Sequence, residues 1–161
     1  MTFLAIGDFK GIVMKKILAV ATGGGHWSEL VLLKPILSRG YVKYVTTIDG
    51  LPQQEGFTDF KIVVDANKNK KLATIYSFFQ FFIIFIKFRP DVVITTGAAL
   101  GVIAVFVGKF FGTKNIWLES IANTERLSLS GEIAKPFVHL LLTQYEYLAD
   151  NKELIYQGKI F

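Results

Sequence analysis

The sequence predicts one α/β domain built on a parallel β-sheet that helices cover on both faces. Short apolar segments alternate with longer helical ones from Lys16 onward. Several of the short segments are continuous apolar runs, which is typical of strands buried on both sides. The length of 161 residues is sufficient for one well-buried domain. We expect this domain to occupy residues 14–161, and we assign no function to residues 1–13, a leader or extension without the basic start of a signal peptide.

Six segments are predicted as strands because they are short, apolar and rich in β-branched residues: residues 16–21, 42–49, 60–65, 91–97, 113–120 and 138–144. Helices are predicted for residues 27–39, 72–88 and 98–112, with one or two helical turns in residues 129–137. Pro90 ends the second helix, since the residue before a proline disfavours the helical conformation. Gly112 is typical of a helix C-terminus.

The composition favours a protein that touches a membrane. Hydrophobic residues make up 52% of the chain, but no run of about eighteen apolar residues is uninterrupted. The net charge of +5 fits an anionic partner, either phospholipid headgroups or a phosphate-bearing substrate. Scattered lysines without a recognition motif argue against nucleic acid. Because the chain has no cysteine and only two histidines, His26 and His139, we expect no metal site and no cofactor.

Three loops at the predicted carboxyl ends of strands are unusual: TGGGH, TTGAALG and ESIANTERLSLSG. Ligands bind at this edge of parallel sheets. Gly23, Gly24 and Gly25 expose backbone N–H groups at a helix start, where an anion is held without a charged side chain, although a tight turn is the alternative. His26 is placed there to act as a base or to donate to a phosphate, unless it is a plain surface histidine. His139, inside an apolar strand, is expected to be a hydrogen-bonded core residue.

A nicotinamide-dinucleotide site is an alternative for the same loop. Gly23, Gly25 and Ser28 match G-x-G-x-x-S, and Asp49 ends the second predicted strand, where an acid that binds ribose would lie. The bulky Trp27 and the serine at the third small position count against this alternative, as does the lack of a recognisable hydride-transfer site downstream.

Three stretches resemble one family: TGGGHWSEL after the first strand, VVITTGAALG at the fourth, and WLESIANTERLSLSGEIAKPF after the fifth. They are similar to the acceptor-side subunit of split GT-B glycosyltransferases. That family includes the membrane-docking subunit of the dolichol-pathway N-acetylglucosaminyltransferase and bacterial capsule and exopolysaccharide proteins of the PssD/CpsF type. The N-terminal half of the peptidoglycan enzyme MurG is a more distant match. The resemblance implies a Rossmann-like sheet equivalent to the N-terminal lobe of a GT-B enzyme, while a separate chain holds the UDP-sugar.

The resemblance also implies site residues. His26 is the candidate general base for the acceptor hydroxyl, and Glu119, at the end of the fifth strand, would orient or replace it. Substrate-binding candidates are the two glycine-containing loops and the polar loop after the fifth strand: Gly23, Gly24, Gly25, Thr96, Gly97, Ala98, Asn123, Glu125 and Arg126. Arg126 is expected to pair with phosphate or, alternatively, with Glu125 or Glu119, which would pin the loop.

The predicted helix at residues 72–88 is too apolar to face water. Its polar residues, Thr74, Ser77, Gln80 and Lys87, fall near one narrow stripe, and the rest of its circumference is almost entirely apolar. At about 1.5 Å per residue it reaches some 25 Å, which favours lying in the membrane interface over crossing it. A core helix or a protein interface is the alternative. We predict membrane contacts from Phe78, Phe79, Phe81, Phe82, Phe85, Lys70, Lys71, Lys87 and Arg89.

The sequence thus supports two hypotheses. The first is the acceptor- and membrane-binding subunit of a two-chain, inverting glycosyltransferase. It would transfer a sugar from a UDP-sugar to a polyprenyl-diphosphate-linked saccharide in capsule or exopolysaccharide synthesis, at the cytoplasmic face of a bacterial cell membrane. A bacterial source fits because the N-terminal anchor expected of the eukaryotic subunit is not recognised. This hypothesis requires a donor-binding partner chain in a hetero-oligomer, with little or no activity without it. The second hypothesis is a noncatalytic membrane adaptor that recruits and activates a glycosyltransferase.

Overall fold

The computed structural model describes residues 14–66, 71–150 and 152–160. These residues form one parallel sheet with the strand order β3-β2-β1-β4-β5-β6-β7. The strands are β1 Lys16–Val20, β2 Tyr41–Thr46, β3 Phe60–Ile62, β4 Val92–Thr95, β5 Lys114–Leu118, β6 Leu140–Thr143 and β7 Leu154–Tyr156. The predicted parallel α/β fold is confirmed, with one strand more than expected.

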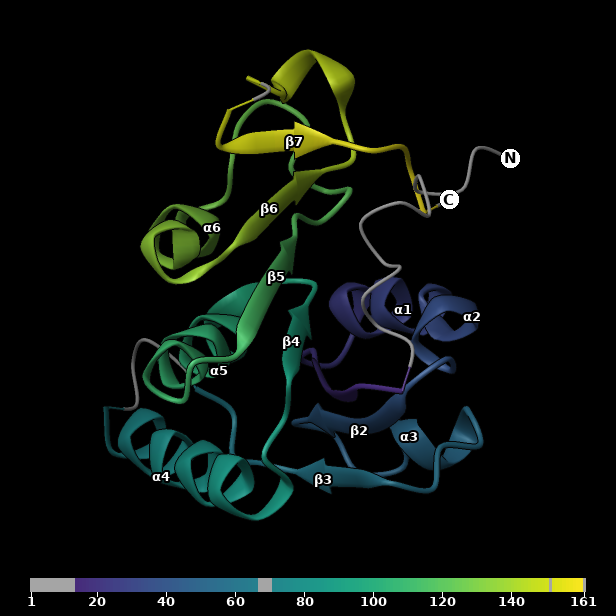
Figure 1. Cartoon of the computed structure of the whole chain (residues 1–161), viewed down its shortest axis with the longest axis vertical. Coiled ribbons are helices and arrows are strands. Elements are labelled where there is room, and N and C mark those ends of the chain that lie inside the picture. Colours follow the sequence, from purple (N-terminus) through teal and green to yellow (C-terminus); the bar gives the residue numbers. More distant parts are fainter. Residues whose placement is uncertain (1–13, 67–70, 151, 161) are drawn as a thin grey trace.

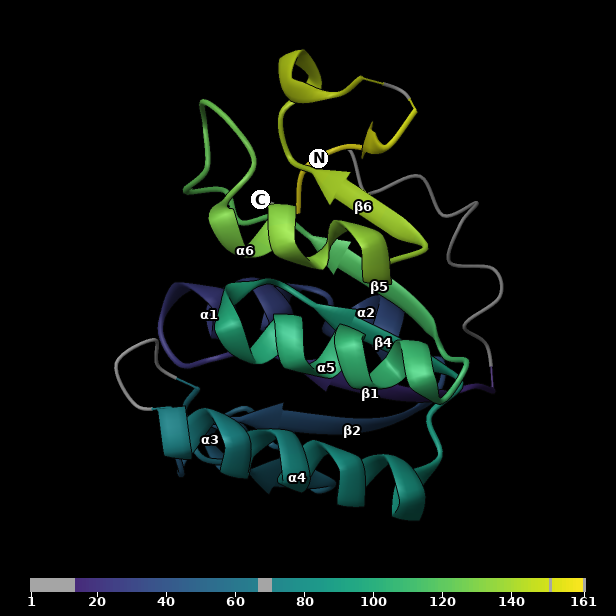
Figure 2. The same ribbon diagram turned by 90° about the vertical axis from the view of Figure 1, so that its left-hand side faces the viewer.

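Helices cover both faces of this sheet (Figures 1 and 2). One face carries α1 Gly25–Leu32, α2 Lys34–Leu37 and α3 Leu51–Gln54, and the other carries α4 Lys71–Phe88, α5 Ala98–Phe110 and α6 Leu129–Ala134. Two 3-10 turns follow at η2 Lys135–Phe137 and η3 Glu146–Leu148. The chain steps outward from β1 to β3 and then crosses back and steps from β4 to β7. Because such crossovers are right-handed, this reversal moves the helices to the opposite face.

The core consists of two apolar layers, one on each side of the sheet. Ile17 and Ala19 of β1 pack toward the α1 side, whereas Leu18 and Val20 pack toward the α5 side, as expected for alternating side chains. All four of these side chains have no exposed surface. The continuous apolar run that predicted β1 therefore serves two cores at once.

Two loops meet at the point where the strand order reverses. β1 and β4 are hydrogen-bonded neighbours, although 71 residues separate Val20 from Val92, and the chain leaves the two strands in opposite directions. The loops after these two strands start side by side at the carboxyl edge of the sheet, and the helices that follow them lie on opposite faces. The two loops contain Gly23–Gly25 and Thr96–Ala98, so the fold brings two of the predicted glycine-containing loops together.

Several element predictions are wrong in detail. The helix expected at residues 27–39 is two helices, because Pro35 near the start of α2 has no N–H for the helix before it. A short helix, α3, begins in the stretch expected to be a loop. The C-terminal segment forms β7, which pairs with β6 in parallel. The three residues of β7 are too few for a periodic signal in the sequence. The carboxylate of Asp150 organises the turn that precedes β7 by accepting three backbone N–H bonds.

The prediction that His139 lies in the core is wrong, although its hydrogen bond is present. His139 precedes β6 and is exposed, at the edge of the sheet opposite the glycine loops. Its Nδ1 accepts a hydrogen bond from the backbone N–H of Asn115 at 3.1 Å. Partial desolvation and the positive charges of Lys109 and Lys114 lower the pKa of its imidazole. These features indicate a neutral histidine with a local structural role.

Candidate functional site

The loop between β1 and α1 presents open backbone at the start of a helix. Gly24 precedes α1 with φ 78°, a conformation that favours glycine, and no side chain caps the helix. A Cβ on Gly23 would lie 2.1 Å from Cδ1 of Ile48, so a larger residue there would require the exposed Ile48 side chain to move. A Cβ on Gly25 would meet no atom within 4 Å, so the chain itself does not require a glycine there. The exposed N–H groups of this helix start are suited to an anion.

His26 is fixed to the loop after β4 by two hydrogen bonds. Its Nδ1 lies 2.8 Å from the carbonyl oxygen of Thr96, and the Thr96 hydroxyl donates to the His26 carbonyl at 2.7 Å. A carbonyl oxygen only accepts, so Nδ1 carries the hydrogen, and Nε2 of the neutral ring is left as an acceptor. A Cβ on Gly97, whose φ is 122°, would lie 3.0 Å from Cε1 of His26. The ring is therefore held in one orientation with the tautomer that a general base requires.

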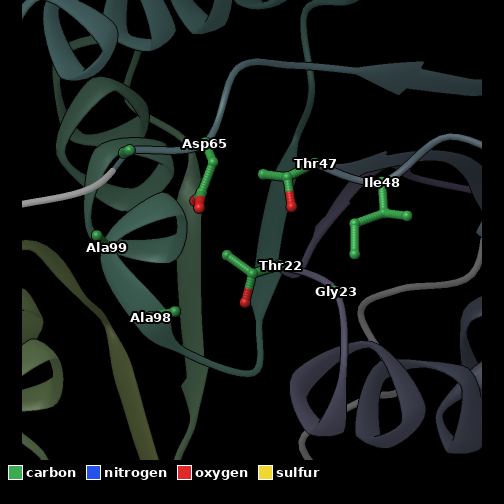
Figure 3. Close-up of a pocket in the computed structure, with 8 residues that line it drawn as sticks. Thr22, Gly23, Thr47, Ile48, Asp65, Ala98 and Ala99 are labelled. Carbon is green, nitrogen blue, oxygen red and sulfur yellow. The ribbon is translucent and has the colours of Figure 1, made fainter. Parts of the chain in front are cut away.

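A hollow of about 540 Å³ lies between the loops after β1, β2 and β3 and the start of α5. Its lining includes Ala98, the residue after Gly97, but not His26 itself. Figure 3 shows the carboxylate of Asp65 and the hydroxyls of Thr22 and Thr47 around it, with Ala98 on the side of α5. Ala98 adopts φ 63°, which costs a non-glycine residue about 1–2 kcal/mol. Such hydroxyl and carboxylate oxygens are suited to binding sugar hydroxyls. Sequence reasoning singled out none of the side chains of Thr22, Thr47 and Asp65; Thr22 begins the TGGGH stretch, but Thr47 and Asp65 belong to no motif.

Glu119 lies beneath the surface and not in this hollow. It is 2% exposed, and its carboxylate accepts hydrogen bonds from Nε1 of Trp117 at 2.9 Å and from the side-chain amide of Asn123. The carboxylate also lies against Gly131, where a Cβ would be 2.5 Å from Oε2. Both oxygens of Glu119 are thus occupied, and the arrangement holds Asn123 and the loop after β5 in place.

Other side chains that hold the same loop were missed by sequence reasoning. Glu29, buried on α1, accepts bonds from the Ser120 hydroxyl at 2.7 Å and from the backbone N–H of Ile121 at 3.1 Å. The hydroxyls of Tyr145 and Tyr147 donate to backbone carbonyls of the loop, each at 2.6 Å. Glu29 could have been found from the sequence, because it is an acidic residue among the apolar residues of the predicted helix. These bonds tie the loop after β5 to α1 on one side and to the C-terminal segment on the other.

Glu125 and Arg126 are exposed at the outer part of this loop. Within the part of the chain that the structure describes, Arg126 forms no ion pair with Glu125 or Glu119. Asp49, which the nicotinamide alternative places at a ribose, accepts hydrogen bonds from the backbone of Gly50 and the side chain of Gln53 at the start of α3.

A second surface with candidate function is the outer side of α4. The large apolar residues that it exposes are Leu72, Ile75, Tyr76, Phe79, Phe82, Ile83 and Ile86. Two residues of the predicted polar stripe turn toward the protein: Ser77 is fully buried, and Oε1 of Gln80 accepts the backbone N–H of Val64 at 2.9 Å. Hence the polar stripe does not cover the exposed side, which is apolar along the length of the helix. An exposed face of this kind marks an interaction surface.

The predicted membrane contacts need correction at two positions. Phe81 and Phe85 have no exposed surface and pack in the core against α5 and the sheet, so they cannot meet lipid without unfolding. Phe79 and Phe82 are exposed, and Phe78 is half-buried. Lys71, Lys87 and Arg89 are exposed, and Lys70 lies outside the described residues. Sequence periodicity could not separate these phenylalanines, because apolar residues surround the helix on nearly every side.

By length and composition α4 resembles a membrane span, with 22% of it buried. Core helices of soluble proteins meet the same criteria. Here Phe81, Ile84 and Phe85 of α4 belong to the core, and the helix packs alongside α5. Crossing a bilayer would remove these side chains from the core, so the geometry favours a helix that lies along a surface.

Comparison with known families identifies the chain over most of its length. Residues 62–160 match the family described as oligosaccharide biosynthesis protein Alg14 like. The UDP-N-acetylglucosamine transferase subunit ALG14 of Yarrowia lipolytica is 30% identical over 84% of this chain and 76% of its own length. The corresponding subunit of Schizosaccharomyces pombe is 40% identical over 37% of this chain and 31% of its own.

Solved structures show the same fold. MurG of Acinetobacter baumannii superposes with a TM-score of 0.73 at 11% identity, over 89% of this chain and 45% of that one. A UDP-GlcNAc 2-epimerase of Neisseria meningitidis, bound to UDP-GlcNAc, gives 0.69 at 10% identity over 90% of this chain and 47% of that one. The chain thus spans less than half of these proteins, and the predicted equivalence to the N-terminal lobe of a GT-B glycosyltransferase is confirmed. Its sequence relatives are more specific, and they show that the chain belongs to the Alg14-like family of oligosaccharide biosynthesis proteins, subunits of UDP-N-acetylglucosamine transferases.

Proposed function

We propose that this chain is the acceptor- and membrane-binding subunit of a two-chain, inverting glycosyltransferase. It acts with a donor-binding chain that supplies the other lobe of the cleft and holds a UDP-sugar, UDP-N-acetylglucosamine being favoured by the names of the relatives. The acceptor is a polyprenyl-diphosphate-linked saccharide at the cytoplasmic face of a bacterial membrane, in capsule or exopolysaccharide synthesis. The observation that carries the proposal is the oriented His26 ring beside an uncapped helix start and a polar hollow.

The diphosphate of the acceptor binds at the start of α1. Gly24 and Gly25 are exposed, and a Cβ at either position would meet no atom within 4 Å among the residues that the structure describes. Backbone N–H groups at this helix end stabilise the negative charge without a lysine. Arg126, exposed and without an ion pair among the described residues, is available to a second phosphate oxygen.

The acceptor sugar occupies the hollow beside Thr22, Thr47 and Asp65. These side chains accept hydrogen bonds from its hydroxyls and place the reacting hydroxyl toward His26. The His26 ring packs on Gly97, whose neighbour Ala98 lines the hollow. Glu119 holds the side chain of Asn123 and so orders the loop after β5, from which Asn123 is offered to the substrate.

In the reaction, the oxygen of the acceptor hydroxyl attacks C1 of the UDP-sugar from the face opposite the diphosphate. A new C1–O bond forms, the bond from C1 to the diphosphate oxygen breaks, and UDP leaves with the electron pair. Nε2 of His26 takes the proton of the hydroxyl, because Nδ1 already donates to Thr96. Membrane contact through α4 keeps the lipid-linked acceptor within reach of the hollow, since α4 begins only five residues after Ala66.

The test is sugar transfer from UDP-N-acetylglucosamine to a lipid-linked acceptor in membranes by this chain, its donor-binding partner, and both together. We expect activity only with both. His26→Ala should abolish transfer while partner and membrane binding persist, and His139→Ala, the other histidine, should retain it. Full transfer by the partner alone would contradict the proposal. Full transfer by the His26→Ala complex would leave this chain as a noncatalytic adaptor.

A further inference from the structure

A groove of about 390 Å³ lies between α4 and the edge of the sheet. Its lining includes Lys43 of β2, Phe60 and Lys61 of β3, and Ile83, Lys87 and Phe88 of α4. β3 is the last strand of the sheet and pairs only with β2, so no further strand covers this side of the groove among the described residues. It is distinct from the hollow near His26, with which it shares no residue.

The sheet register explains why lysines converge on this groove. Lys61 lies opposite Val45, and Lys43 is two residues before Val45 on the same strand. Side chains two apart on a strand share a face, so both lysines lie on the face that α4 covers. On α4, Ile83 and Lys87 are four residues apart and therefore also share a face. Three ammonium groups from three elements thus surround one apolar groove.

The charges in the groove are only partly balanced. The ammonium of Lys43 binds the carboxylate of Asp59 and lies 5.2 Å from the ring centroid of Phe88. Neither Lys61 nor Lys87 has an ion-pair partner in the described part of the chain. Three lysines against one carboxylate leave an excess of positive charge over an apolar lining. The groove is therefore complementary to an amphiphilic ligand, with an anionic group next to an apolar part.

The groove is continuous with the exposed apolar side of α4. Ile83 belongs to both, with half of its surface exposed. The groove lies about 18 Å along the helix from Lys71, at about 1.5 Å for each of twelve residues. A membrane that covers the outer side of α4 therefore also meets the groove, at Ile83.

We propose that this groove is a binding site for the phosphate of an anionic phospholipid headgroup. Lys61 and Lys87, assisted by Lys43, bind the phosphate oxygens, and Ile83 and Phe88 contact the glycerol and the first methylenes. The proposal rests on the membrane role of α4 and adds a specific lipid contact to it. Bound there, the lipid fixes the rotation of α4 on the membrane and so sets the height of the hollow above it.

A first experiment measures binding of the full chain to vesicles of phosphatidylcholine alone and of phosphatidylcholine with phosphatidylglycerol. The Lys61→Gln/Lys87→Gln variant should bind the anionic vesicles about 25-fold more weakly, at roughly fivefold per lysine, with binding to neutral vesicles unchanged. The matched control is Lys114→Gln/Lys152→Gln, which removes the same charge away from the groove. An equal loss in the control would overturn the proposal, because only general attraction would remain.

A second experiment locates the lipid. The chain has no cysteine, so single cysteines can be introduced and labelled with an environment-sensitive dye. A label at Ile83→Cys should be quenched by brominated phosphatidylglycerol more strongly than by brominated phosphatidylcholine at equal bromine content. A label at Ser38→Cys, exposed directly after α2 on the other side of the sheet, should not be quenched by either. Equal quenching of Ile83→Cys by both lipids would overturn the headgroup site.

A third arm separates a headgroup from free phosphate. Inorganic phosphate at millimolar concentration, at constant ionic strength, should not displace the chain from anionic vesicles, since it lacks the apolar part. Displacement by phosphate would assign the groove to a soluble anion and contradict the proposal. Absence of all vesicle binding by the unmodified chain would instead contradict the membrane role itself, so the two failures are distinguishable.

Discussion

Two phenylalanines of α4, two positions apart, should have opposite effects on stability and on membrane binding when each is replaced by alanine. Phe81 has no exposed surface and lies in the core, whereas Phe79 is 58% exposed on the outer side of the helix. Phe81→Ala should destabilise the fold by about 3–5 kcal/mol, because it leaves a cavity that the sheet and α5 cannot fill. Phe79→Ala should change the free energy of unfolding by less than about 0.5 kcal/mol.

Membrane binding should respond in the reverse order. A phenylalanine buries about 200 Å², so the exposed part of Phe79 amounts to roughly 115 Å². At ~25 cal/mol per Å², full insertion is worth about 3 kcal/mol and half insertion about 1.5 kcal/mol. Phe79→Ala should therefore weaken vesicle binding by roughly 10- to 150-fold. Urea unfolding and vesicle flotation measure the two quantities. Unchanged flotation of Phe79→Ala, with its fold intact, would refute the assignment of this face to lipid.

Three further predictions concern the glycine loop and two titrating groups. Gly25→Ala should change the free energy of unfolding by less than about 0.5 kcal/mol, since its Cβ meets no neighbour, but it should weaken binding of a prenyl diphosphate. Gly24→Ala should lower the free energy of unfolding, measured in denaturant, by about 1 kcal/mol because of the φ of 78° at this position. Three backbone N–H bonds lower the pKa of Asp150 to about 2, so the stabilisation that its carboxylate gives is present above pH 4 and is lost as the pH falls toward 2. Asp150→Ala should therefore be less stable than the unmodified chain at pH 7, and this difference in stability should disappear in acid. Burial raises the pKa of Tyr44 to about 12, so the fold should lose stability between pH 10 and 12. Tyr44→Phe should remove this part of the loss, as measured by thermal unfolding. An identical alkaline profile for the variant and the unmodified chain would contradict the burial argument.

The parallel sheet was predictable because its central strands are buried on both sides. β1 and β4 are continuous apolar runs, and the loops after them carry the glycines that mark the edge of the sheet where ligands bind. β7 was not predictable, since three residues held by the bonds of Asp150 and by pairing with β6 have no periodic signal. The break between α1 and α2 follows from Pro35, but the turn at Leu33 depends on tertiary packing.

The candidate site was predictable only in part. The glycine loop, His26 and the loop of Thr96 were found by their residue types, and the structure joins them by hydrogen bonds across seventy positions of sequence. That contact fixes the orientation of the ring, which no local pattern encodes. Glu119 was found as an acid at the end of a strand, but only the structure reveals that Trp117 and Asn123 occupy its oxygens. Asp65 and Thr47 approach the hollow from the β2 and β3 side, and their roles depend on topology alone.

The central claim, that this chain binds the acceptor and not the donor, is tested most directly by calorimetric titration of the full chain without its partner. The ligands are a short-chain prenyl diphosphate sugar and UDP-N-acetylglucosamine, and Gly25→Val serves as the variant that blocks the start of α1. We predict saturable binding of the prenyl diphosphate sugar, loss of that binding in Gly25→Val, and little or no binding of UDP-N-acetylglucosamine. Tight binding of UDP-N-acetylglucosamine without binding of the prenyl diphosphate sugar would contradict the account.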